Sequence, residues 1–148
     1  MRGVYSVVRT TGSISTAQNL IELECGAKSI EILRAWVQTQ SPDTVEQMII
    51  AIRRVTAAGA SGTGLTERPL SGDTTTPTAN TYAGDRAPTA ANNLIREAVP
   101  NVGGFMHAPT PEERIECSGT SDGIVLRLDE ALSTNHVLEC GIIWREVG

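Results

Sequence analysis

The feature that most constrains the fold is an alternation of apolar and polar residues at every second position, repeated along much of the chain. In NLIELEC (19–25), for example, Glu22 and Glu24 separate the apolar side chains. Side chains of a β-strand point alternately to opposite faces, so this period predicts strands with one buried face. β-rich or alternating segments of this kind cover residues 4–10, 19–25, 29–40, 121–131 and 136–147.

Residues 41–55 fit two structures. Ser-Pro-Asp at 41–43 resembles a helix start, and the apolar residues from Val45 onward fit a helical spacing. Met48, Ile50 and Ile52 fit a strand equally well. The strand-rich neighbours favour the second structure, so we expect a strand over residues 46–57.

The remaining segments complete an all-β chain. Residues 93–99 fit a short strand or a helical turn, and residues 103–109 and 113–119 fit short strands. A length of 148 residues suits one domain. We therefore expect residues 1–148 to form a single β-sandwich or jelly roll of about eight strands with one long central loop.

The central loop, residues 58–93, is the most informative segment. It is rich in Gly, Pro, Thr and Ala and holds too few large apolar residues to form a core of its own. Such long loops are uncommon inside compact domains. One interpretation is an arm that gains order from a neighbouring subunit, with Arg68, Tyr82 and Arg86 as contact residues. The other interpretation is a solvated surface loop. If the segment is an arm, shortening it should leave the sandwich folded.

The three cysteines, Cys25, Cys117 and Cys140, have no metal-ligand spacing. Each falls on the apolar side of its expected strand. We therefore expect buried, reduced thiols that behave as small hydrophobic side chains.

Charge and hydropathy argue against two classes of partner. The net charge is −5 and no basic stripe forms, so no nucleic-acid partner is expected. No apolar stretch approaches a membrane span, and the first twelve residues lack the pattern of a signal peptide.

No catalytic, cofactor-binding or metal-binding motif stands out. The glycines of GASGTG (59–64) lack phosphate-loop spacing, and a cupin-type metal site needs more histidines than His107 and His136. A pair of catalytic carboxylates stays open, although the five aromatic residues are few for a sugar-binding groove. We expect no enzyme and no cofactor.

The order of segments resembles small β-sandwich structural proteins of tailed bacteriophages, several of which are capsid decoration (cement) proteins. The likeness lies in two strands joined through Gly-Ala-Lys (26–28), in EQMIIAIRRVTAAGASGTG (46–64), in LSGDTTTPTANTYAG (70–84), and in the closing segment SDGIVLRLDEALSTNHVLECGIIWREVG (121–148). This likeness covers nearly the whole chain except residues 94–115. It assigns no functional role to any residue of this chain.

This resemblance implies a single jelly roll, usually oligomeric, that is bound to a virion shell. The expected function is a homotrimeric decoration protein that binds the major capsid protein on the outer capsid surface, after synthesis in the host cytoplasm. One alternative is a tail or fibre-tip component that binds a receptor. Another, from a different class, is a small cupin-like or carbohydrate-active enzyme.

Overall fold

The computed structural model describes residues 3–41, 44–56, 62–70, 75–83, 92–120 and 122–148. Two antiparallel β-sheets pack face to face in this part of the chain, and a 3-10 turn lies at Pro111–Glu113. None of the described residues forms a helix that is long and apolar enough to cross a membrane. The prediction of an all-β sandwich is confirmed.

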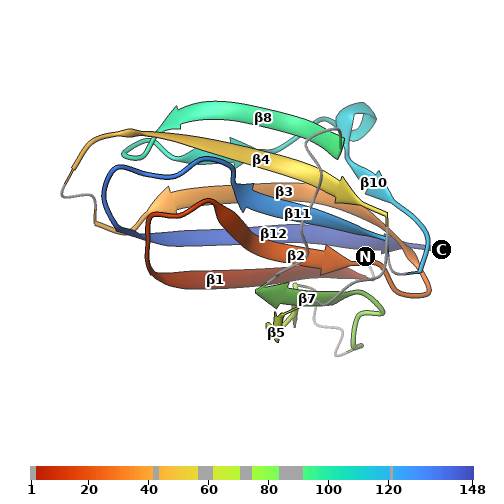
Figure 1. The fold of residues 1–148 in the computed structure, drawn as a ribbon. Helices are drawn as coiled ribbons and strands as arrows, with labels where there is room; N and C mark the ends of the chain where they lie inside the picture. The colour runs from red at the N-terminus through yellow and green to blue at the C-terminus, as the bar shows by residue number, and fades with distance from the viewer. Residues whose placement is uncertain (1–2, 42–43, 57–61, 71–74, 84–91, 121) are drawn as a thin grey trace.

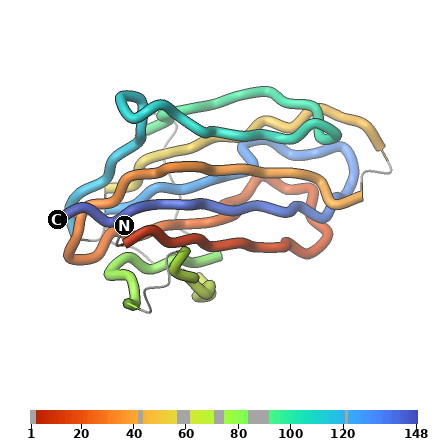
Figure 2. Tube along the Cα trace, turned by 180° about the vertical axis from the view of Figure 1, so that it is seen from behind, coloured from red at the N-terminus to blue at the C-terminus, as the bar shows by residue number. Residues whose placement is uncertain are grey.

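Among the described residues each sheet has six strands. Figures 1 and 2 show the two sheets from opposite sides. Sheet A runs in the order β10–β3–β12–β1–β6, with β9 also paired to β3. Sheet B runs in the order β5–β7–β2–β11–β4–β8. The strands of sheet A are β1 (Val4–Ile14), β3 (Ser29–Thr39), β6 (Arg68–Pro69), β9 (Phe105–His107), β10 (Glu116–Cys117) and β12 (His136–Val147). Those of sheet B are β2 (Gln18–Glu24), β4 (Gln47–Val55), β5 (Thr63–Gly64), β7 (Asn80–Ala83), β8 (Asn93–Pro100) and β11 (Gly123–Leu128).

Successive strands cross from one sheet to the other. The first four strands alternate between sheets A and B. Near the C-terminus, β11 lies between β2 and β4, and β12 lies between β1 and β3. Strands distant in sequence therefore become neighbours. The two ends of the chain lie at the same end of the sandwich (Figure 1), where Val4 pairs with Arg145.

The core fills the space between the sheets. Its largest fully buried side chains include Trp144 and Phe105, together with leucines and isoleucines from both sheets. In β4, Met48, Ile50 and Ile52 belong to this core. The predicted strand is thus confirmed within one to two residues at each end, and the helix alternative is wrong. Residues 93–99 also form a strand, β8.

The central segment, residues 58–93, is not one long loop. Its described parts contain three short strands that extend both sheets. Strand β6 pairs with β1, β7 pairs with β2, and β5 pairs with β7. The expectation that order in this segment must come from a partner is wrong for these parts. Residues 57–61, 71–74 and 84–91 lie outside the described residues.

Two carboxylates and one core residue fix this segment to the sandwich. Glu146 Oε1 accepts hydrogen bonds from Thr78 N at 2.5 Å, Thr78 Oγ1 at 3.0 Å and Ala79 N at 2.9 Å. Glu67 Oε1 accepts two more from Thr81. Ala79 is 1% exposed and joins the main core. The segment therefore closes one side of the sandwich.

Gly26 is required for this arrangement. A Cβ atom at residue 26 would lie 1.9 Å from the carbonyl oxygen of Thr78. The turn between β2 and β3 thus approaches the central segment backbone to backbone, which only glycine permits.

Candidate functional site

The outer face of sheet A carries an exposed apolar row across four strands. Val8 pairs with Gly141, Gly141 with Trp36, and Trp36 with Met106. Val8 is 59% exposed and Met106 is 52% exposed. Side chains directly opposite one another on neighbouring strands lie on the same face of a sheet. The row therefore forms one continuous surface on sheet A, whose strands β3, β12 and β1 lie nearest the viewer in Figure 2.

Gly141 determines how the centre of this row is filled. A Cβ atom at residue 141 would lie 2.2 Å from Trp36 Cζ2, so the indole ring of Trp36 covers the Gly141 backbone. The guanidinium carbon of Arg34 lies 5.3 Å from the centre of the same ring, a cation–π contact. A glycine in the interior of a strand often marks such a close approach. Gly141 was the only feature of the sequence that indicated this row, and the prediction from the sequence did not include it.

The predicted contact residues lie elsewhere. Arg68, exposed, is in β6 at the edge of sheet A, where it pairs with Ser6. Tyr82, partly buried, is in β7 of sheet B, where it pairs with Glu22. Arg86 lies outside the described residues. The structure therefore places Arg68 and Tyr82 in different sheets, and their predicted role as partner contacts stays a prediction.

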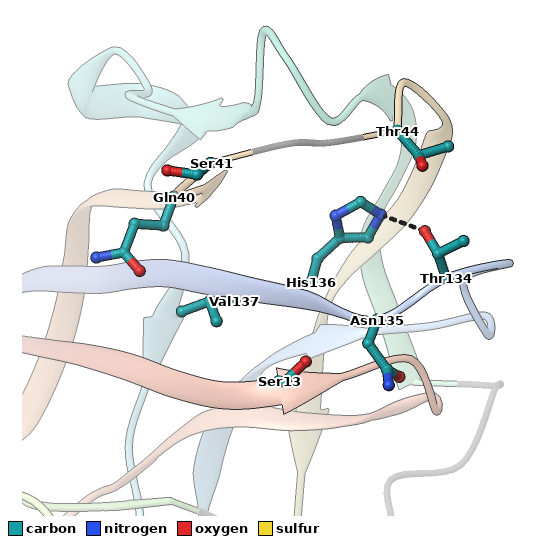
Figure 3. Close-up of a pocket in the computed structure, with 8 residues that line it drawn as sticks. All are labelled: Ser13, Gln40, Ser41, Thr44, Thr134, Asn135, His136 and Val137. Atoms are coloured by element: carbon teal, nitrogen blue, oxygen red, sulfur yellow. Dashed lines mark hydrogen bonds between the residues drawn. The ribbon is translucent and has the colours of Figure 1, made fainter.

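A polar cavity of about 360 Å³ lies between three connections at one end of the sandwich. Figure 3 shows the imidazole of His136 beside Thr134, whose Oγ1 lies 3.0 Å from His136 Nε2. Hydroxyl and amide side chains form most of the wall: Ser13, Gln40, Ser41, Thr44, Thr134 and Asn135, with His136 and Val137. Such a wall suits a small, uncharged polar molecule.

Glu46 fixes the turn beside this cavity. Its carboxylate accepts hydrogen bonds from Ser133 N at 2.7 Å, Thr134 Oγ1 at 2.9 Å and His136 Nε2 at 2.9 Å. The bond from Ser133 N, followed by that from His136, lowers the Glu46 pKa to about 2. His136 is thus a structural partner of Glu46.

A second carboxylate organises the outer face of sheet B. Asp129 accepts hydrogen bonds from Arg96 Nε at 2.6 Å and Arg127 Nε at 3.0 Å, and it also binds Arg53. Burial alone would raise the Asp129 pKa, but these three arginines outweigh it and lower the pKa. On the same face Glu22 is fully buried. The expectation that Glu22 points to solvent is therefore wrong, because this face of sheet B is covered at that point.

The described residues bring no cluster of three or more His, Cys, Asp or Glu side chains into position to hold a metal ion. His107 lies in β9, and burial lowers the pKa of its imidazole. His136 begins β12.

All three cysteines are buried, as predicted, and belong to the main core. Their positions differ in one respect that the sequence did not reveal. Cys25 and Cys117, 92 positions apart in the sequence (117 − 25), share a hydrogen bond between their thiols. Cys140 instead donates to the carbonyl oxygen of Arg9.

Comparison with known proteins adds no relative: no protein-family model, no curated protein and no solved structure matches this chain.

Proposed function

We propose that this chain is a virion structural protein of the capsid decoration type, which binds the outer surface of a shell and bridges its major capsid subunits. The observation that carries the proposal is the exposed row Val8–Trp36–Met106 on sheet A. Two further features support it. They are the likeness of the segment order to phage sandwich proteins and the winding of the strands between two sheets, which we assign to a jelly roll.

The area of the sheet A face that carries this row fits a weak contact that is repeated many times. The outer face of the three long strands β1, β12 and β3, counted over about ten residues each, measures roughly 500 Å², from strand spacings of about 4.8 Å and a rise of about 3.3 Å. A stable protein interface buries about 800 Å² on each partner. One copy would therefore bind weakly, and a homotrimer on a repeating shell would bind tightly through multivalency.

The experiment uses shells assembled from the major capsid protein of the same genome. Purified protein is mixed with the shells, and the bound fraction is measured by sedimentation. Val8→Glu places a charge at one end of the row, inside the proposed contact, and should weaken binding at least tenfold, which corresponds to about 1.4 kcal/mol or more. Val102→Glu is the matched control, since Val102 is 62% exposed against 59% for Val8 and lies outside the row.

The outcomes of this experiment test the decoration function and the proposed contact surface separately. If the parent protein does not sediment with the shells, the decoration function is wrong. If both glutamate variants bind like the parent, the function stands and the row on sheet A is not the contact.

A tail or fibre-tip component is the second candidate. The polar cavity beside His136 favours it, because hydroxyl and amide side chains suit recognition of a receptor saccharide. The number of copies in each particle distinguishes the two candidates, since a decoration protein is abundant and a tail tip is scarce.

A further inference from the structure

Two buried thiols meet at the end of the sandwich where the chain termini lie. Cys25 directly follows β2 of sheet B, and Cys117 is the last residue of β10 in sheet A. They are 2% and 3% exposed. Backbone contacts hold both cysteines in place: Cys25 N donates to Asp122 O at 2.8 Å, and Cys117 pairs with Ile30 of β3. The contact therefore joins the two sheets.

The two cysteines differ in access. Cys117 lines a cavity of about 430 Å³, with Ser29, Glu31, Arg54 and Glu116 among the other wall residues. This cavity is large enough for a molecule such as hydrogen peroxide. The hydrogen bond to Cys117, followed by burial, raises the pKa of the Cys25 thiol in the reduced pair, and oxidation of Cys117 removes the larger of these two causes. Cys117 is thus the thiol that a reagent reaches first.

We propose that Cys25 and Cys117 are a redox-active pair, in which peroxide oxidises Cys117 and Cys25 then closes a disulfide between the sheets. In the first step the Cys117 sulfur attacks one peroxide oxygen, the O–O bond breaks, and sulfenic acid and water form. In the second step Cys25 Sγ attacks the sulfenic sulfur, and a second water leaves with the thiol proton. Overall, two thiols lose two electrons and peroxide is reduced to two waters. This inference does not depend on the proposed function.

Cys140 provides an internal control. It is also fully buried, but its thiol donates to the Arg9 carbonyl rather than to another cysteine. Burial raises the pKa of this thiol to about 12, and its hydrogen-bond partner is a backbone carbonyl, which cannot act as a resolving thiol. The proposal therefore predicts reaction at one pair and none at the third cysteine.

The test treats the folded parent protein with hydrogen peroxide, without any substitution. Thiol titration after denaturation should fall from three groups to one, and peptide mass spectrometry should show one Cys25–Cys117 cross-link that dithiothreitol removes. The oxidised protein should also unfold at a higher urea concentration than the reduced protein, because the cross-link constrains the unfolded chain. Three remaining thiols, or a cross-link that involves Cys140, would overturn the proposal.

Cys25→Ser separates a pair from two independent thiols. Without its partner, Cys117 should accumulate as sulfenic acid, trapped by dimedone, and then as the irreversible sulfinic and sulfonic acids. Cys140→Ser is the matched control and should form the same reversible cross-link as the parent. Reversible loss of the Cys117 thiol in Cys25→Ser to the same extent as in the parent would show that Cys25 is not the resolving thiol.

Discussion

Replacing Glu146 tests whether the central segment is held by this chain's own sandwich. The side chain is 2% exposed, and its Oε1 atom alone accepts the three hydrogen bonds from Thr78 and Ala79. Glu146→Ala removes that acceptor and leaves two backbone N–H groups without it. Glu146→Gln keeps an acceptor oxygen and removes only the charge.

The expected magnitudes follow from these contacts. A hydrogen bond to a charged group contributes about 1.5–3 kcal/mol, and three that share one oxygen contribute less than their sum. We expect Glu146→Ala to lower the free energy of unfolding by roughly 3–5 kcal/mol and Glu146→Gln by about 1 kcal/mol. The contact of Glu146 with Lys28, 3.9 Å away, adds little, because Lys28 is 46% exposed.

Urea unfolding followed by tryptophan fluorescence measures these differences, since Trp144 is fully buried in the core. Hydrogen exchange at the amides of Thr78 and Ala79 should accelerate strongly in Glu146→Ala and only slightly in Glu146→Gln. An alanine variant within about 1 kcal/mol of the parent, with both amides still protected, would refute the claim that this carboxylate fixes the segment.

Three further predictions concern stability. Folding lowers the pKa of Glu46 from 4.5 to about 2, so its carboxylate stabilises the fold fully above about pH 4.5 and loses this contribution as the pH falls towards 2. In acid titrations the difference in stability between the parent and Glu46→Gln should therefore shrink over that range. Asp129→Asn should cost roughly 2–4 kcal/mol in urea unfolding, because the buried carboxylate that binds Arg53 and Arg127 loses its charge, and an unchanged midpoint would contradict the role of this cluster. Deleting residues 62–83 should lower the thermal midpoint markedly rather than leave the sandwich intact, because Ala79 and three strands are lost.

The sequence predicts the long strands well because their burial is one-sided. In β4 the alternation of Met48, Ile50 and Ile52 fitted a strand as well as a helix, and the strand-rich neighbours favoured the strand. The core position of all three residues confirms it. The same pattern placed all three cysteines in the interior. These are local signals, which a single segment carries by itself.

The short strands and the surfaces were not predictable in this way. Strands β5 and β6 have two residues each and are held by backbone pairing to β7 and β1, so no periodic signal marks them. Val8, Trp36 and Met106 become neighbours only through the register of four strands. The burial of Glu22 likewise depends on what covers sheet B. Each of these features is a property of tertiary pairing rather than of local sequence.

The proposed decoration function is tested most directly by locating the protein in purified particles of the virus that encodes it. Electron cryomicroscopy and quantitative mass spectrometry of the same preparation give its position and its number of copies relative to the major capsid protein. We expect many copies, in threefold clusters on the outer shell, with the Val8–Trp36–Met106 row against the capsid subunits. A few copies confined to the tail, or none in the particle, would contradict the proposal.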